Sequence, residues 1–276
     1  MKNYLSALKY CYENGDFVKS RAGNVKKAFG YQMRFDLEKG FPAITTKKLA
    51  WKAVVSELLW FLEGSNDERR LAEILYEDDR ENLEDKKTIW TQNAKADYWK
   101  NKSNFDGDVG RIYGVQWKDF HGVDQVKNLI KGLKESPNSR RHILTAWNPA
   151  ELDEMSLPPC HAFSQFYVSN NKLSCQLYQR SCDMFLGVPF NIASYSILIH
   201  IIAKECGYDV GEFIHSLGDF HIYEEHFEQV KIQLTRDPKK LPVLKFNQKK
   251  LHEYKTSDFE LINYEHHPKI LAPMNV

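Results

Sequence analysis

The chain has 276 residues, of which 42% are hydrophobic and 13% aromatic, and its formal net charge at pH 7 is +1. This length and composition allow a sizeable core, and the balanced charge argues against a protein whose main ligand is a nucleic-acid backbone. No apolar run reaches the ~18 residues of a membrane span, and the amino-terminal end lacks the apolar segment of a signal peptide.

The first half of the chain is predicted to be mainly helical. In chain order, apolar spacing and turn residues predict helix 3–14, loop 20–24, strand 29–37, helix 50–62, a charged helix and loop at 66–88, loop 101–110, helix 124–133 and turn 136–139. Glu57 lies inside the apolar helix 50–62, where a lone carboxylate is costly to bury. It must therefore be paired, hydrogen-bonded or functional.

The second half holds most of the predicted strands. In chain order we expect strand 142–147, strand 162–168, strand 173–178, helix 191–206, strand 213–217 and helix 223–236. Asn170-Asn171 is a strong hairpin signal. The interleaved elements predict an α+β fold, with a large mixed or antiparallel sheet and surrounding helices. We expect a single domain over 1–276, with a variable peripheral segment at about 66–108.

Residues 157–191 concentrate the chemistry. Leu157-Pro158-Pro159-Cys160-His161 opens this stretch, and Gln179-Arg180-Ser181-Cys182-Asp183 follows the predicted hairpin. Two prolines hold the backbone before Cys160 extended, and nearby arginines (140, 141 and 180) are expected to lower the pKa of its thiol. His161 should face the opposite way and is a poor base for Cys160. The five cysteines form no Cys-x-x-Cys pair, which predicts reduced thiols in the cytoplasm and no metal site.

Other residue types suggest a phosphorylated heterocycle as the ligand, although each has a simpler explanation. The guanidinium groups of Arg21, Arg140, Arg141 and Arg180 suit a phosphate dianion, or are solvated surface charges. Asn191 at a predicted helix start is either an N-cap or an amide that matches N3–H and O4 of uracil. His221 and Tyr223 share a face in an extended segment and clamp a sugar hydroxyl, or are half-buried strand residues. Trp90 and Asp183 suit a flat ring.

Four motifs together resemble the thymidylate synthase family over nearly the whole chain. They are Leu157-Pro158-Pro159-Cys160-His161, Tyr178-Gln179-Arg180-Ser181, the segment from Gly187 to Tyr195, and Gly218-Asp219-x-His221-x-Tyr223. The resemblance implies a homodimer that packs through a sheet face and binds dUMP and a reduced folate, with no membrane or nucleic acid required. Arg140 and Arg141 would reach the phosphate from the partner subunit.

The resemblance also implies roles for individual residues. Cys160 would add to C6 of dUMP. The nucleotide would be bound by Arg21, Arg180, Ser181, Gln179, Asn191, His221 and Tyr223, and protons would be managed by Glu57 and Tyr113. The co-substrate 5,10-methylenetetrahydrofolate would contact Trp90, Asp183, Leu186 and Val276, with Lys47 on its glutamate tail.

The same scaffold supports two outcomes at the last step. Hydride transfer to the exocyclic methylene gives dTMP and dihydrofolate, the thymidylate synthase reaction, which we favour. Water addition instead gives 5-hydroxymethyl-dUMP and tetrahydrofolate, the reaction of a dUMP hydroxymethylase. A third hypothesis is a catalytically silent nucleotide-binding or nucleic-acid-binding protein on this fold. The retained Cys160 argues against it.

Departures from the family pattern leave the last step open. Residues 22–26 replace a Thr-Gly run, Thr91 replaces Asp after Trp90, Arg111 replaces Pro, Phe220 replaces a small residue, and Asn275 replaces Ala. We expect Thr91, Arg111, Phe220 and Asn275 to lie on the folate side of the site. These four positions motivate the hydroxymethylase alternative.

Overall fold

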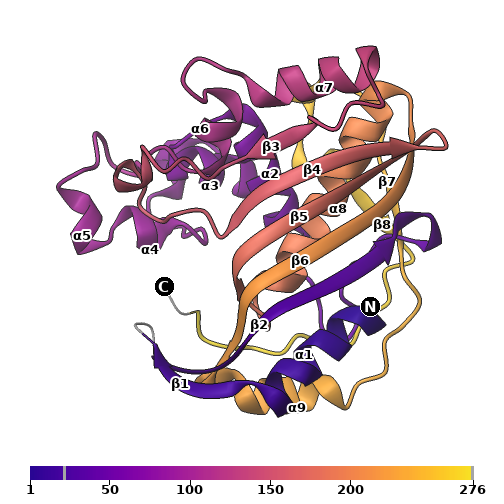
Figure 1. The fold of residues 1–276 in the computed structure, drawn as a ribbon. Helices are drawn as coiled ribbons and strands as arrows, with labels where there is room; N and C mark the ends of the chain where they lie inside the picture. The colour runs from indigo at the N-terminus through magenta and orange to yellow at the C-terminus, as the bar shows by residue number, and fades with distance from the viewer. Residues whose placement is uncertain (21–22, 275–276) are drawn as a thin grey trace.

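The computed structural model describes residues 1–20 and 23–274, and a mixed sheet dominates it (Figure 1). Its strands are β1 (Asp16–Ser20), β2 (Gly23–Asp36), β3 (Ile143–Thr145), β4 (His161–Ser169), β5 (Lys172–Asp183) and β6 (Asp209–Tyr223). Within the described residues they form one six-stranded sheet in the order β1-β2-β6-β5-β4-β3. The β5–β6 pair is parallel and the other pairs are antiparallel, so the predicted α+β class with a mixed sheet is confirmed.

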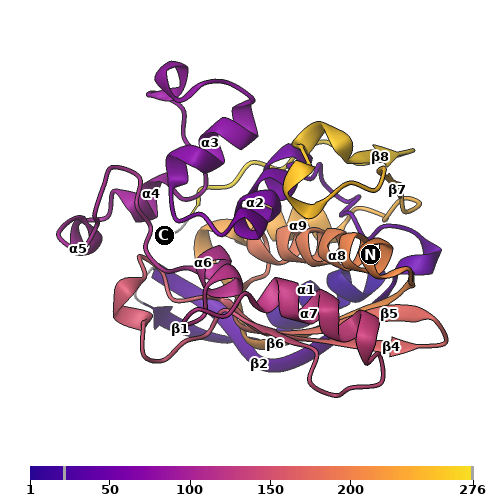
Figure 2. The same ribbon diagram turned by 90° about the horizontal axis from the view of Figure 1, so that it is seen from above.

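The helices surround one face and one edge of the sheet. They are α1 (Lys2–Asn14), α2 (Trp51–Glu63), α3 (Glu68–Tyr76), α4 (Thr91–Ala94), α5 (Asp97–Lys100), α6 (Tyr113–Lys118), α7 (Gln125–Glu135), α8 (Gly187–Cys206) and α9 (Phe227–Leu234). Figure 2 shows α8 lying over the sheet, with α2 on the far side of α8. The segment from α3 to α5 extends outward from the sheet in both views. No described helix is long and apolar enough to cross a membrane.

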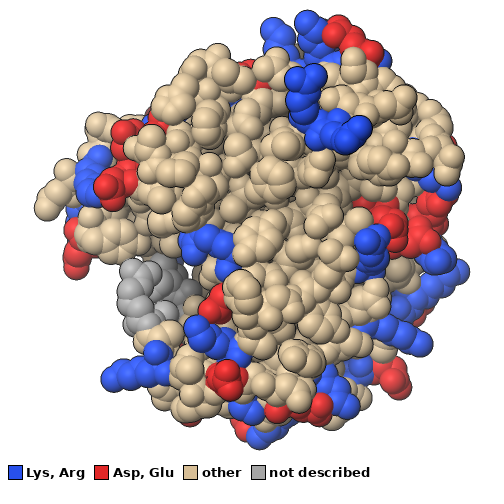
Figure 3. Space-filling model, viewed as in Figure 1, with Lys and Arg blue, Asp and Glu red and all other residues tan. Residues whose placement is uncertain are grey.

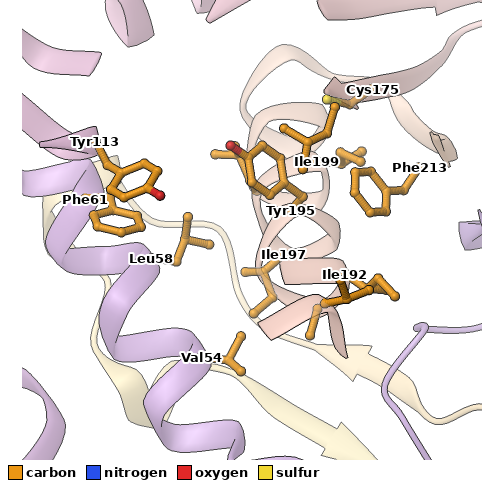
Figure 4. Packing of buried hydrophobic residues seen from close by; sticks show 14 of the residues in the cluster. Val54, Leu58, Phe61, Tyr113, Cys175, Ile192, Tyr195, Ile197, Ile199 and Phe213 are labelled. Carbon is orange, nitrogen blue, oxygen red and sulfur yellow. The ribbon is translucent and has the colours of Figure 1, made fainter. Parts of the chain in front are cut away.

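The core lies between the sheet, α8 and α2 (Figure 4). Helix α8 is apolar almost all round because it is covered on both sides. On the sheet side, Tyr195 stacks on Phe213 of β6 with ring centroids 5.9 Å apart. Facing α8, Leu58 and Phe61 of α2 are both 1% exposed. This packing fixes α2, and with it Glu57, relative to the sheet.

Strand β6 changes its inward-facing positions at Gly218. Phe213, His215 and Leu217 are buried before it, whereas after it Phe220 and Ile222 are both 0% exposed and His221 between them is 9% exposed. A Cβ at Gly218 would lie 2.8 Å from the Tyr178 hydroxyl and 3.0 Å from the Arg180 carbonyl oxygen, so only glycine fits here. His221 and Tyr223 therefore share a face, as predicted, and their rings contact each other with centroids 5.3 Å apart.

Several predicted boundaries were wrong. Ser20 ends β1 and Gly23 begins β2, so these parts of the predicted loop at 20–24 are strand, and β2 and β6 are much longer than their predicted cores. Helix α8 starts at Gly187 rather than at 191, and a 3₁₀ turn precedes α9. Helix α6 and the pair β7 (Val243–Lys245) and β8 (Glu260–Ile262) were not predicted.

The second face of the sheet carries apolar side chains without a covering layer in the described protomer. Phe29 is 80% exposed and Tyr167 63% exposed, and Phe163 and Tyr178 are partly exposed as well. In Figure 3 uncharged residues fill the middle of this face, while Lys, Arg, Asp and Glu gather at its rim. A broad uncharged patch of this kind is typical of a protein–protein interface.

Candidate active site

Cys160 lies directly before β4 and directly after Pro158 and Pro159. Its backbone N–H donates to the Tyr113 hydroxyl oxygen at 2.6 Å, and its carbonyl oxygen accepts from the Arg180 backbone N–H at 2.8 Å. The residue is half-buried, whereas Cys11, Cys175 and Cys182 are buried. Helix α6 and strand β5 thus hold the backbone of one partly accessible thiol from two sides.

The thiol of Cys160 does not have the lowered pKa that the sequence predicted. Burial raises its pKa above the ordinary value, and the positive charge of Arg180 and hydrogen bonds from Tyr113 and Ser181 only offset part of this rise. In the isolated protomer, the free-energy cost of removing the thiolate from water is larger than the stabilisation that one nearby guanidinium charge provides.

Arg180 braces the loop that carries Cys160. Its Nε donates to the Pro159 carbonyl at 2.8 Å and its Nη2 donates to the Pro158 carbonyl at 2.7 Å. The guanidinium carbon lies 5.4 Å from the ring centroid of Trp147, within cation–π range. The remaining N–H groups of this half-buried side chain stay available to a ligand anion.

Glu57 and Trp90 form a buried pair beside Tyr113. The indole Nε1 of Trp90 donates to Glu57 Oε1 at 2.7 Å, and both residues are 6% exposed. Burial raises the pKa of Glu57 to about 7, although the Trp90 hydrogen bond acts in the opposite direction. A carboxyl group with this pKa exchanges protons readily at neutral pH.

His161 belongs to the core and not to a catalytic pair with Cys160. Its Nδ1 lies 3.0 Å from the Tyr195 hydroxyl, and its ring stacks on Tyr113 with centroids 4.0 Å apart. Burial lowers the pKa of His161 to about 3, so the imidazole is neutral. This agrees with the prediction that it is a poor base for Cys160.

Asn191 lies in the second turn of α8 and is not an N-cap, because the helix already begins at Gly187. Its Oδ1 accepts from Gln179 Nε2 at 3.1 Å, and Gln179 Oε1 lies 2.8 Å from Nε2 of the buried His215. Burial lowers the pKa of His215 to about 3. The neutral imidazole donates to Gln179 and so orients both amides in turn.

Ser181, His221 and Asp219 lie together at the ends of β5 and β6. Ser181 is half-buried and pairs with Asp219 across the parallel strands, and its carbonyl oxygen accepts from Gln179 Nε2 at 2.9 Å. Asp219 Oδ1 lies 3.1 Å from His221 Nδ1, and its other oxygen accepts from Lys27 Nζ at 3.0 Å. The His221 hydrogen bond is the main cause of the lowered pKa of Asp219. The carboxylate thereby fixes the imidazole next to Tyr223.

Arg140 and Arg141 lie far along the sheet from Cys160. Ile143 pairs with Gln165 and Thr145 with Phe163, so Arg141, two residues before Ile143, lies near the level of Tyr167 on β4. Seven residues separate this level from Cys160, which is roughly 20 Å at about 3.3 Å per residue. Arg140 and Arg141 are both exposed and cannot reach the Cys160 site of their own protomer.

The half-buried thiol of Cys160 therefore lies between the Tyr113 phenol and the Arg180 guanidinium group. The amides of Gln179 and Asn191 and the carboxyl group of Glu57, whose pKa is about 7, lie at the same end of the sheet. A family model described as thymidylate synthase matches residues 2–276. The chain belongs to the thymidylate synthase family. It is thus a folate-dependent enzyme of the type that transfers a one-carbon unit to dUMP, which confirms the resemblance.

The residues expected on the folate side of this family site fit a flat, N–H-bearing heterocycle. Asp183 Oδ1 accepts from the backbone N–H groups of Phe185 and Leu186 at 2.9 and 3.2 Å, which sets the entry to α8. Within the described residues the Oδ2 atom of Asp183 has no hydrogen-bond donor, so this oxygen can accept from a ligand. Leu186 is half-buried at the N-cap position of α8.

Lys47 is buried rather than surface-exposed. It is 6% exposed, and its Nζ donates to the Phe185 carbonyl at 2.5 Å and lies 3.6 Å from the Phe185 ring centroid. Burial lowers its pKa to about 8, and the charge of Asp183 opposes this shift. Its contact with a glutamate tail stays a prediction.

One of the four departures, Phe220, is not a folate-side residue in the structure, whereas the expected place of Arg111 on the folate side stays a prediction. Phe220 was expected there, and this was wrong, because strand alternation after Gly218 puts it in the core against Tyr31 (5.7 Å) and Tyr10 (6.2 Å). Arg111 is held by Glu151, to which its Nε donates at 2.6 Å, and by the Asp119 carbonyl at 2.7 Å.

Some predictions fall outside the described residues. Arg21, Ala22, Asn275 and Val276 lie outside residues 1–20 and 23–274, so their predicted roles stay predictions.

Sequence reasoning missed two buried polar residues beside Trp90. Glu68 is 1% exposed and bonds to Thr91, the departure next to Trp90. Asn93 is 5% exposed, and its Nδ2 has no hydrogen-bond partner in the described part of the chain. The unusual polarity after Trp90, where Thr-Gln-Asn-Ala follows, was the available signal.

Proposed function

We propose that this enzyme is a thymidylate synthase that converts dUMP to dTMP through a covalent bond between Cys160 Sγ and C6 of the uracil ring. The observation that supports this most is the position of Cys160. It is a half-buried thiol whose backbone is held by Tyr113 and Arg180, whereas Cys11, Cys175 and Cys182 are buried and the half-buried Cys206 lies at the C-terminal end of α8. A nucleophile held in this way is oriented before the substrate binds.

The first step is addition of the thiolate. The sulfur bonds to C6, and the electron pair of the C5–C6 double bond moves toward O4 and makes C5 nucleophilic. Asn191 binds the N3–H and O4 edge, because the Gln179 donor on its Oδ1 fixes the orientation of its amide. The dianionic phosphate group of dUMP binds near Cys160, and its ligands from β5 are Arg180 and Ser181.

The second requirement is proton transfer at C5 and O4. We assign it to Glu57, with Tyr113 close by and with ordered water as the carrier. The pKa of Glu57 at about 7 supports both uptake and release of a proton at neutral pH. Once C5 has gained the one-carbon unit, the C5 proton leaves to the base and the electron pair stays in the ring.

The sugar and the co-substrate have separate ligands. His221 and Tyr223 bind the ribose 3′-hydroxyl, and Asp219 orients the imidazole. Methylenetetrahydrofolate supplies the one-carbon unit and is then expelled as tetrahydrofolate, which leaves an exocyclic methylene on C5. For dTMP, tetrahydrofolate transfers a hydride to this methylene and becomes dihydrofolate, while the C5–C6 double bond forms again and the Cys160 thiolate leaves C6. Trp90, Asp183 and Leu186 would hold it, together with Val276 and, at its glutamate tail, Lys47.

We further propose that the active form is a homodimer. Two observations support it, namely the uncharged open face of the sheet and the distance between Arg141 and Cys160 within one protomer. A two-fold axis across this face would deliver Arg140 and Arg141 to the phosphate of the other subunit. Their added positive charge would also favour the thiolate of Cys160, which the isolated protomer disfavours.

One observation favours the dUMP hydroxymethylase alternative. Asn93 belongs to α4 and lies three residues, or about one helical turn, after Trp90, the N-cap of this helix. Its buried Nδ2 lacks a partner among the described residues, and a buried donor of this kind binds water readily. Water held there would compete with hydride for the exocyclic methylene.

Product mass separates these reactions. We expect incubation with dUMP and methylenetetrahydrofolate to give a nucleotide that has gained a methyl group, with a matching rise in dihydrofolate absorbance. A product heavier by one oxygen, without that rise, would identify the hydroxymethylase. Absence of any modified nucleotide, with dUMP binding intact, would support the silent binding protein.

A further inference from the structure

A second buried carboxylate lies behind the Glu57–Trp90 pair. Glu68, the first residue of α3, is 1% exposed and accepts four hydrogen bonds. Arg69 donates to it from Nε and Nη2, both at 2.6 Å, and the hydroxyls of Thr88 and Thr91 donate to Oε1 at 2.6 and 2.5 Å. Burying a carboxylate is costly without such donors, so the four hydrogen bonds fix the position of the Glu68 carboxylate.

The two threonines connect this carboxylate to Trp90. Thr88 Oγ1 accepts from the Trp90 backbone N–H at 3.1 Å, and Thr91 Oγ1 accepts from the Thr88 backbone N–H at 2.8 Å. Each hydroxyl therefore donates to Glu68 and accepts from a backbone N–H of the segment that leads into α4. Trp90, which lies between the two threonines in the sequence, donates its indole N–H to Glu57 at 2.7 Å.

Arg69 anchors the same cluster to the outer segment. Its Nη1 donates to the carbonyl oxygens of Leu83 and Lys86, both at 3.0 Å. Those residues belong to the stretch that leads from α3 to Trp90. Glu68 thus links α3, the segment between α3 and Trp90, and the start of α4. The indole of Trp90 is the part of this unit that contacts Glu57.

We propose that Glu68 is a positioning residue that holds Trp90 on Glu57 through the hydroxyls of Thr88 and Thr91. This inference rests on the proposed acid–base role of Glu57. Glu68 touches neither the nucleotide nor the reacting atoms, and it acts by fixing the donor that tunes Glu57.

The electrostatic surroundings of Glu57 make the indole donor the main adjustable contact. Among residues 1–20 and 23–274, the ionisable groups that interact electrostatically with Glu57 are the phenols of Tyr113 and Tyr195, whose pKa values burial raises well above the ordinary value, so both are neutral. The nearby imidazole of His161 is neutral as well. Loss of the Trp90 hydrogen bond should therefore raise the pKa of Glu57 further.

The test is the pH dependence of kcat for Glu68→Gln in the full-length enzyme. A glutamine cannot accept all four bonds, and we expect the apparent pKa of the Glu57 limb to move upward by about half to one unit. The matched control is Glu73→Gln, on the same helix, whose carboxylate bonds to Arg70 and Arg80 instead. The control should keep the parental profile.

A double variant shows whether Glu68 acts through Trp90. In a Trp90→Phe background, which has already lost the indole donor, Glu68→Gln should add no further shift. An unchanged limb in Glu68→Gln, or equal shifts in both backgrounds, would overturn the proposal. If Glu68→Gln fails to fold, Thr88→Val decides, because it removes the hydroxyl bonded to the Trp90 backbone and should give the same upward shift. A parent enzyme that does not modify dUMP would instead refute the proposed function.

Discussion

The hydroxyl oxygen of Tyr113 lies 2.6 Å from the backbone nitrogen of Cys160 and accepts its hydrogen bond. Tyr113 is the first residue of α6 and Cys160 precedes β4, so this bond joins two elements that are 47 residues apart. It fixes the proposed nucleophile from the side opposite to Arg180.

Tyr113→Phe should slow both chemistry and thiol alkylation. The change leaves the Cys160 N–H without its acceptor, and an unsatisfied buried donor costs about 1–3 kcal/mol, or roughly 5- to 150-fold in rate. We expect kcat/KM and the rate of iodoacetamide modification of Cys160 to fall together. Tyr98→Phe is the matched control, because Tyr98 donates to the Ser156 carbonyl instead. Equal effects of the two variants would contradict the assignment.

Glu57→Gln should abolish turnover yet alter stability in a pH-dependent way. The pKa of Glu57 is about 7 in the folded state, whereas the ordinary value for a glutamate side chain is 4.5, so the folded state binds the extra proton between these values. The stability of the parent therefore falls as pH rises from about 4.5 to 7, by about 3 kcal/mol. Glutamine does not titrate.

Urea denaturation of parent and Glu57→Gln at pH 5 and pH 8 checks this sign. The unfolding free energy of the variant minus that of the parent should be larger at pH 8 than at pH 5. Glu63→Gln at the exposed end of the same helix serves as the substitution control. A stability difference between parent and Glu57→Gln that is the same at both pH values would mean that the carboxyl group is not desolvated.

Asn191→Asp should relax discrimination between dUMP and dCMP. The amide presents one donor and one acceptor to uracil, whereas a protonated carboxyl group suits the opposite pattern of cytosine. We expect kcat/KM for dUMP to fall by about 10- to 100-fold, as one mispaired buried polar contact predicts. The ratio of dUMP to dCMP turnover measures the effect, and a ratio equal to that of the parent would exclude a base-reading role.

Mixed dimers test whether Arg141 acts across the interface. Cys160→Ser and Arg141→Ala should each be nearly inactive, and in a C₂ dimer their random mixing should restore about a quarter of the parental sites. Only a heterodimer then pairs an intact Cys160 with an intact Arg141. Activity no higher than the average of the separate variants would place Arg141 and Cys160 in one protomer or outside the site.

Local signals in the sequence were sufficient to predict turns, caps and those helices and strands that keep one hydrophobic period. The hairpin at Asn170-Asn171 was predicted because both residues tolerate positive φ, and they adopt φ of 49° and 60°. Asp124 caps α7 as expected, accepting from the Lys127 N–H. Helix α6, with six residues, was too short to show a helical period.

Strand β6 illustrates where periodicity fails. Its inward positions change from odd to even numbers at Gly218, so a search for strict alternation recovers only 213–217 of a strand that spans Asp209–Tyr223. The same change put Phe220 in the core instead of on the folate side. The parallel pairing of β5 with β6 also depends on long-range packing that local patterns do not contain.

The candidate site was accessible to sequence reasoning where a residue type conflicted with its surroundings. Glu57 stood out because it interrupts an apolar helix. Glu68 did not, because it lies in a charged segment and its partners Thr88 and Thr91 are 20 and 23 residues away. The raised pKa of Cys160 could not be foreseen either, since it follows from burial in the folded protomer.

The measurement that tests the account most directly is release of tritium from dUMP labelled at C5. Both dTMP and 5-hydroxymethyl-dUMP require loss of this hydrogen, so the result does not depend on the last step. We predict folate-dependent release by the parent and none above background by Cys160→Ser. Release by Cys160→Ser at the parental rate would contradict the proposed bond between Cys160 and the uracil ring.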